Sequence, residues 1–126
     1  MRTIATATAA GVVLVGMWAS PAMASSDVDV RGDCSAASEW RLKVQPRTTG
    51  TLRVEFEVDS DVPGQRWRVV ISDNGTEVFA GTRRTEDGSG DFRVRRTLAD
   101  RAGPDNIVAT ATNVATGETC TAEGTY

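Results

Sequence analysis

The chain has 126 residues, enough for one domain, and its 17 acidic side chains outnumber its 14 lysines and arginines, giving a net charge of −3. This acidic balance argues against a nucleic-acid partner, because nucleic-acid recognition needs a basic surface. Histidine is absent, which excludes Ser-His-Asp and Cys-His catalysis and the usual zinc sites.

Residues 1–24 are expected to be a secretion signal that is removed. A positively charged start is followed by an apolar stretch from Ile4 to Trp18 and by the cleavage pattern Ala22-Met23-Ala24. The apolar stretch is shorter than the roughly 20 residues that span a bilayer. We therefore expect residues 25–126 to form a single domain that is exported to the medium or the cell envelope without membrane insertion.

Most segments of residues 25–126 alternate apolar with polar side chains, and none shows a sustained helical period. A period of two is typical of β-strands with one face on a core. The expected inward positions are, in chain order, Trp40, Leu42 and Val44; Leu52, Val54, Phe56 and Val58; Trp67, Val69 and Ile71; Val78 and Ala80; Phe92 and Val94; and Ile107, Ala109 and Ala111. The domain is therefore predicted to be all β.

A two-residue turn is predicted at Asn74-Gly75, because a type I′ turn needs positive φ at both positions and this pair tolerates it. The turn fixes the pairing of the strands that it joins. It pairs Asp73 with Thr76, Ile71 with Val78 and Val69 with Ala80. All three pairs are expected to lie on one face.

The same register predicts that Val70 lies opposite Phe79 on the outward face. An apolar pair on an otherwise charged face can mark a partner site, so Val70 and Phe79 are the candidate partner surface. Isolated exposed hydrophobic residues are also ordinary in soluble proteins. A terminal segment such as Ser25 to Arg31 could equally cover the pair.

Cys34 and Cys120 lie near the two ends of residues 25–126 and are the only cysteines. In an exported protein a disulfide is their expected state, and only one connectivity exists within the monomer. A redox-active pair would normally place its sulfurs close in sequence, as in C-x-x-C. A bridge closing so long a loop contributes on the order of 4 to 5 kcal/mol in the chain-entropy picture.

A four-residue hairpin loop is predicted at Val114 to Gly117. It places Ala111 opposite Cys120 and Ala109 opposite Ala122. Because the two strands then share an inward face, the Cys120 sulfur is expected to point into the core.

Seven or eight short strands in about 100 residues predict a two-sheet sandwich of immunoglobulin-like or fibronectin-like type. The predicted bridge differs from the immunoglobulin bridge, which joins strands B and F, because it ties the start of the domain to its last strand. A small closed barrel is the alternative.

Glu55 and Glu57 form a candidate catalytic pair. They share a strand face, and alternate residues of a strand lie roughly 6 to 7 Å apart, a carboxyl separation that glycoside hydrolysis can use. The competing interpretation is ion pairing with arginines of the same and other strands, namely Arg53, Arg66, Arg68, Arg93 and Arg95. We favour ion pairing, because a small sandwich presents a flat sheet and not a cleft.

Two acidic clusters could offer oxygen ligands to calcium: Asp59 with Asp61, and Glu86 with Asp87 and Asp91. Neither has the ligand spacing of a twelve-residue calcium loop, so solvated turn acids are the favoured interpretation. No metal and no cofactor are predicted.

Several sequence strings resemble a group of small secreted proteins from high-GC Gram-positive bacteria. The strings are Val54-Glu55-Phe56-Glu57-Val58-Asp59-Ser60, Gly64-Gln65-Arg66-Trp67-Arg68-Val69-Val70, Val78-Phe79-Ala80-Gly81-Thr82-Arg83 and Asn113-Val114-Ala115-Thr116-Gly117-Glu118-Thr119-Cys120. The resemblance covers Val30 to Tyr126, including both cysteines. It implies an exported β-sandwich with one disulfide and brings no activity, cofactor or site residues.

The function expected from these observations is a non-enzymatic extracellular module that binds a protein or an envelope polymer through a sheet face or loop tips. One alternative is an inhibitor of secreted hydrolases that inserts a constrained loop such as Asp100 to Asp105. A lesser alternative is a small carbohydrate-active enzyme that uses Glu55 and Glu57.

Overall fold

The computed structural model describes residues 27–126, together with Gly11 and Gly16. The predicted signal, residues 1–24, otherwise lies outside the described residues. Within the described part, no helix is long and apolar enough to cross a bilayer.

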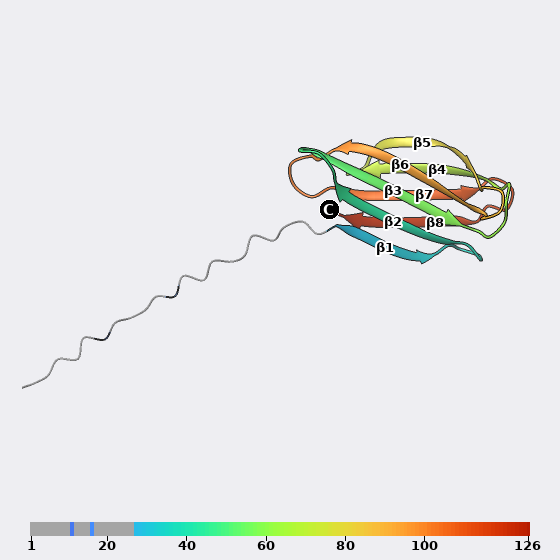
Figure 1. Cartoon of the computed structure of the whole chain (residues 1–126), viewed down its shortest axis with the longest axis horizontal. Coiled ribbons are helices and arrows are strands. Elements are labelled where there is room, and N and C mark those ends of the chain that lie inside the picture. The colour runs from blue at the N-terminus through green and yellow to red at the C-terminus, as the bar shows by residue number, and fades with distance from the viewer. Residues whose placement is uncertain (1–10, 12–15, 17–26) are drawn as a thin grey trace, which may run out of the picture.

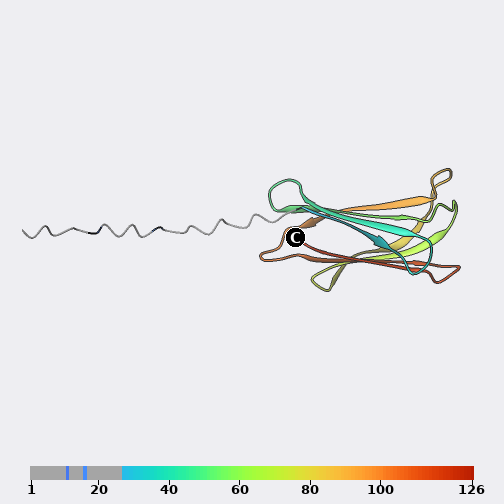
Figure 2. The same cartoon turned by 90° about the horizontal axis from the view of Figure 1, so that it is seen from below.

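Eight antiparallel strands form two four-stranded sheets that face each other as two layers (Figures 1 and 2). The strands are β1 (Val28–Asp33), β2 (Glu39–Pro46), β3 (Thr51–Asp59), β4 (Arg66–Asp73), β5 (Thr76–Arg84), β6 (Asp91–Ala99), β7 (Asn106–Asn113) and β8 (Thr119–Thr125). Their order is β1-β2-β3-β6 in one sheet and β5-β4-β7-β8 in the other. The predicted all-β sandwich is confirmed.

The core lies between the sheets and follows the predicted alternation in every strand except β5. In β3 the side chains of Leu52, Val54, Phe56 and Val58 are fully buried, while the residues between them are half-buried on the outer face. Burial of each such side chain contributes about 1.5–3 kcal/mol. Trp67 of β4 is the largest fully buried side chain, and its ring centroid lies 6.2 Å from that of Phe92 in β6.

The turn between β4 and β5 forms as predicted, with φ of 49° at Asn74 and 81° at Gly75. Asp73 pairs with Thr76, as expected. Beyond Ser72 the predicted register is wrong, because a β-bulge shifts it between Ile71 and Ser72. The observed pairs are Ile71 with Phe79, Val70 with Ala80 and Val69 with Gly81, in place of Ile71 with Val78 and Val69 with Ala80.

Because of the bulge, Phe79 and Ala80 of β5 lie on the sheet faces opposite to those predicted. Val78 is the extra residue, and Phe79 moves to the inner face, where it is 8% exposed. Ala80 becomes exposed. The physical reason is side-chain size. Burying an aromatic ring on the inner face in place of a small alanine gains more free energy than the bulge loses by interrupting the hydrogen-bond ladder between the strands.

The disulfide prediction is confirmed. Cys34, in the loop after β1, is bonded to Cys120 in β8, with the two Cα atoms 4.3 Å apart. Ala111 pairs with Cys120 and Ala109 with Ala122, as predicted, and Cys120 is fully buried. Because β1 and β8 belong to different sheets, the bond joins the two layers covalently.

Candidate functional site

The predicted partner surface of Val70 and Phe79 does not form. Val70 is half-buried on the outer face of β4 and pairs with Ala80. Phe79 lies on the opposite face of the sheet, in the core. The β-bulge between Ile71 and Ser72 places the two side chains on opposite faces, so an outward apolar pair is excluded at this position.

Phe79 instead helps to close the edge of the core where β5 and β6 lie near each other. The guanidinium carbon of Arg83 is 5.0 Å from the Phe79 ring centroid, and that of Arg96 is 4.5 Å away. Such contacts are favourable because the ring face carries negative charge density. Gly81 leaves room for the ring, since a Cβ there would lie 3.0 Å from Phe79 Cζ.

Glu55 and Glu57 are held by arginines on the outer face of the β1-β2-β3-β6 sheet. Glu55 lies 3.3 Å from Arg93 Nε through Oε1 and 3.0 Å from Arg95 Nε through Oε2. Glu57 accepts hydrogen bonds from Nε and Nη2 of Arg93. Arg53 Nη2 also approaches Glu55, at 3.9 Å. This arrangement agrees with the ion-pairing interpretation of the two glutamates.

A second ion pair on this face joins Asp29 of β1 to Arg41 of β2. Arg41 donates from Nε and Nη2 to the two carboxylate oxygens of Asp29, at 2.9 and 2.7 Å. These hydrogen bonds lower the pKa of Asp29 below its ordinary value.

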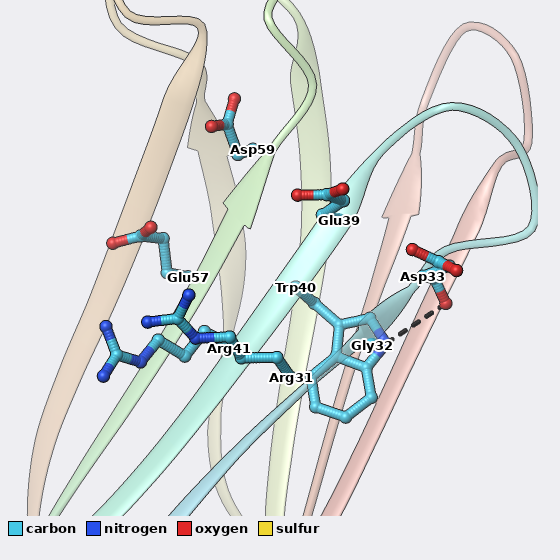
Figure 3. A pocket seen from close by; sticks show the side chains of 8 residues that line it. All are labelled: Arg31, Gly32, Asp33, Glu39, Trp40, Arg41, Glu57 and Asp59. Carbon is cyan, nitrogen blue, oxygen red and sulfur yellow. Dashed lines mark hydrogen bonds between the residues drawn. The ribbon is translucent and has the colours of Figure 1, made fainter.

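A shallow hollow of about 400 Å³ lies at the β1, β2 and β3 end of the same face (Figure 3). Its lining consists of Arg31, Gly32, Asp33, Glu39, Trp40, Arg41, Glu57 and Asp59. Trp40 lies against Gly32, where a Cβ would be 2.5 Å from the indole, and its Nε1 donates to the Asp33 carbonyl oxygen at 3.2 Å. In Figure 3 the side chains of Arg31 and Arg41 extend toward Glu57. The hollow therefore combines both signs of charge.

Three other arginines lie on the outer face of the β5-β4-β7-β8 sheet. Arg66 of β4 is directly opposite Arg84 of β5, and Arg68 follows Arg66 by two positions on the same face. All three side chains are exposed, and within residues 27–126 none makes an ion pair. We call Arg66, Arg68 and Arg84 the arginine face.

Within residues 27–126, the strand residues paired beside Arg68 carry no acidic side chain. Arg68 pairs with Thr82 on one side and Thr112 on the other, and Thr112 pairs with Thr119. The acidic residues of these four strands that face outward, Glu77 and Glu123, pair with Ser72 and Val108 at the far end of the sheet. Like charges opposite each other on a sheet are destabilising, so the pairing of Arg66 with Arg84 lowers the stability of the fold.

Sequence reasoning assigned Arg66 and Arg68 to the wrong sheet face. The pattern Arg66-Trp67-Arg68 shows that both arginines point away from a buried tryptophan. It does not show which sheet the strand joins. The structure places β4 in the sheet that does not contain Glu55 and Glu57, so these arginines cannot neutralise them.

The two acidic loop clusters make hydrogen bonds within their own turns. Asp59 Oδ1 accepts from the Asp61 backbone N–H at 3.0 Å. Asp91 Oδ1 accepts from Ser89 Oγ, and the Glu86 carbonyl oxygen accepts from the Gly90 N–H. In the part of the chain that the structure describes, no group of three or more potential ligand residues is arranged to hold a metal ion.

Comparison of the chain with protein-family models, with curated proteins and with solved structures finds no match. The fold and the disulfide define the protein as a one-disulfide β-sandwich. Its function has to be inferred from the charges and contacts on its surface.

Proposed function

We propose that this protein is a non-enzymatic extracellular module that binds an anionic envelope polymer through its arginine face. The observation that carries the proposal is the contrast between the two sheets. On one outer face, Arg41, Arg53, Arg93 and Arg95 contact carboxylates, while Arg31 and Lys43 make no ion pair within residues 27–126. On the other, Arg66, Arg68 and Arg84 are exposed and have no ion pair within residues 27–126.

The chemistry of guanidinium groups favours this partner. An arginine side chain presents a planar fork of donors that matches carboxylate and phosphate groups in bidentate fashion. Adjacent strands lie about 4.8 Å apart and alternate residues of a strand about 7 Å apart. Three arginines on this lattice offer several donors to successive anionic groups of an extended chain. A polymer with regularly spaced anions fits the face better than a single small ion.

The remaining features are compatible with an extracellular binding module. Disulfides persist in oxidising compartments, which supports export. The neighbouring strands β3 and β6, and the order β4-β7-β8, match the B-E and C-F-G arrangements of the immunoglobulin fold, and Trp67 on β4 corresponds to the buried tryptophan of strand C. The bridge departs from that fold, since Cys34 and Cys120 do not lie on the strands matching B and F. We infer an immunoglobulin-like topology with its own disulfide.

Binding to two defined polyanions tests the proposal. Titration with polyphosphate and with polygalacturonate at low salt distinguishes phosphate from carboxylate chemistry. The triple variant Arg66→Gln, Arg68→Gln, Arg84→Gln is expected to lose binding. Each arginine removed singly should reduce the salt dependence of log affinity by about one.

The matched control is the triple variant Arg53→Gln, Arg93→Gln, Arg95→Gln, which changes the net charge equally on the other sheet. It is expected to retain binding once circular dichroism has shown that it is folded. Equal loss in both variants would mean that only net charge matters. If the wild type binds neither polyphosphate nor polygalacturonate, the proposal of an anionic partner is refuted.

The loop from Asp100 to Asp105 supports a second candidate function, inhibition of a secreted hydrolase. Residues 100–104 are exposed, and the loop is fixed at both ends. The Asp100 N–H donates to the Gly50 carbonyl at 2.8 Å, and Asn74 Nδ2 donates to the Pro104 carbonyl at 3.1 Å. A rigid exposed loop is what an inhibitor needs, because little ordering is required on binding. A screen of secreted proteases at micromolar protein that finds no inhibition would remove this candidate.

A further inference from the structure

Two aspartates bury their carboxyl groups at one end of the sandwich. Asp73 is the last residue of β4 and is 1% exposed, and Asp105 immediately precedes β7 and is fully buried. Within the described residues, none of their four carboxyl oxygens has a hydrogen-bond partner. Burying a carboxylate without a donor or a cation is strongly unfavourable, so a negative charge on each residue is not a stable arrangement.

The nearby hydrogen-bond donors are used elsewhere. The Asp105 N–H donates to the Tyr126 carbonyl at 3.0 Å, and the Tyr126 N–H donates back to the Asp105 carbonyl at 2.9 Å. The Asn74 side chain donates to Pro104 and accepts from the Asn106 N–H at 2.8 Å. These contacts fix the backbone of the loop, and none of them involves the carboxyl group of Asp73 or Asp105.

The charged groups around the pair are mostly acidic. Asp100, at the start of the same loop, lies beside Asp105. The Arg101 side chain is exposed and makes no ion pair within residues 27–126. On the neighbouring strands, Thr76 of β5 and Ile107 of β7 pair with Asp73, and the adjacent Glu77 is exposed. Tyr126, after β8, contacts Asp105 through its main chain. Within the described residues, no arginine or lysine makes an ion pair with Asp73 or Asp105.

We infer that Asp73 and Asp105 share one proton in the folded protein and so form an acid-dependent latch between the end of β4 and the loop from Asp100 to Asp105. In the latched state the O–H of one carboxyl group donates to an oxygen of the other, and the pair carries one negative charge. Release of the proton to solvent leaves two buried negative charges that repel each other. This inference is independent of the proposed function, because it does not involve the arginine face.

The titration directions agree with the latch. Burial raises the pKa of Asp105 above the ordinary 3.8, and the neighbouring carboxyl group of Asp73 raises it further. A raised carboxyl pKa stabilises the folded state at low pH, and this contribution is lost as pH rises through the folded pKa. The loop is therefore expected to be held most firmly in acid and to loosen above that pKa.

The latch makes the anchoring of the loop depend on pH. Residues 101–104 form its exposed tip, while the buried carboxyl group of Asp105 anchors its base. Hydrogen exchange at the Asp105 and Tyr126 amides reports the state of that base, because the two residues exchange backbone hydrogen bonds. We expect the protection of these two amides, measured relative to their intrinsic exchange rates at each pH, to fall as the latch loses its proton.

The test is the pH dependence of unfolding in denaturant between pH 3.5 and pH 8, for the wild type and for Asp105→Asn. The asparagine amide can donate to Asp73 at every pH, so the variant should lose the decline in stability that the wild type shows as pH rises. Asp87→Asn is the matched control, since it removes an exposed loop charge, and it should keep the wild-type profile. Parallel profiles for the wild type and Asp105→Asn would overturn the latch.

A second measurement keeps the inference testable if Asp105→Asn does not fold. Carboxyl carbon NMR of the wild type should show Asp105 titrating with a midpoint above the ordinary 3.8. Titration of Asp105 at or below the ordinary value would refute the shared proton. Calcium added alone provides a further check: stabilisation that a chelator reverses in the wild type would identify a cation in place of the proton.

Discussion

Glu118 holds Ser38 across the ends of the two sheets, beside the disulfide. Its Oε2 accepts from the Ser38 N–H at 2.9 Å and its Oε1 from Ser38 Oγ at 2.9 Å, while the Ala36 N–H donates to Oε2 at 3.1 Å. Cys34 and Cys120 are bonded in the same region. One carboxylate and one disulfide therefore fix the loop between β1 and β2 onto β8, and the first two predictions separate their contributions.

Replacing Glu118 by alanine is expected to lower the free energy of unfolding by about 1–3 kcal/mol. The reason is that buried Ser38 loses its charged acceptor and its polar groups are left unpaired. Urea unfolding measures the change. Glu123→Ala is the control, since Glu123 accepts one hydrogen bond, from Asn106 Nδ2, and should lose much less stability. Equal effects would show that the Glu118 contacts are not maintained in solution.

Reduction of the disulfide is expected to lower the free energy of unfolding by about 2–5 kcal/mol, because the bridge constrains nearly the whole chain of the unfolded domain. Thermal melts in oxidising and reducing buffer provide the comparison. The variant Cys34→Ala, Cys120→Ala should have, in both buffers, the melting temperature of the wild type in reducing buffer. Identical melts of the wild type with and without reductant would contradict this account.

Phe79→Ala is expected to destabilise the fold by about 3 kcal/mol, because it empties the edge of the core and removes the contacts of Arg83 and Arg96. Val70→Ala, on the outer face of the adjacent strand, should cost clearly less. Chemical denaturation of both variants ranks them. A larger loss of stability for Val70→Ala than for Phe79→Ala would show that Phe79 is not buried in the core.

The ion pair between Asp29 and Arg41 predicts a pH effect opposite in sign to that of the aspartate latch. The hydrogen bonds from Arg41 lower the pKa of Asp29, so their stabilising contribution is present above the ordinary 3.8 and is lost as pH falls through the lowered pKa. Arg41→Gln should return the Asp29 titration, followed by NMR, to its ordinary midpoint. Arg95→Gln should leave it unchanged. An ordinary Asp29 midpoint in the wild type would disprove the pair.

Sequence reasoning predicts those parts of the fold in which the pattern has one interpretation. In β3 every second residue is apolar, so its inward face was correctly predicted. The register between β7 and β8 follows from one loop length, and it correctly placed Cys120 opposite Ala111. At Val78 and Phe79 two adjacent apolar residues allow either register, and the period of two cannot show that a bulge lets the larger one face the core.

The site was harder to predict, because it depends on which strands become neighbours. Arg66 and Arg68 could be assigned to acidic partners until the sheet order separated β4 from β3. Asp73 and Asp105 flank a turn and a loop, where acidic residues are normally solvated. Only the three-dimensional arrangement shows that both are buried together.

The most direct test of the proposed function is an NMR titration of the nitrogen-15-labelled protein with polyphosphate at low salt. We predict that the shifts concentrate on the backbone and side-chain N–H groups of Arg66, Arg68 and Arg84 and disappear as salt is added. Shifts concentrated instead at the hollow lined by Arg31, Trp40 and Arg41, or no shifts at all, would contradict the account.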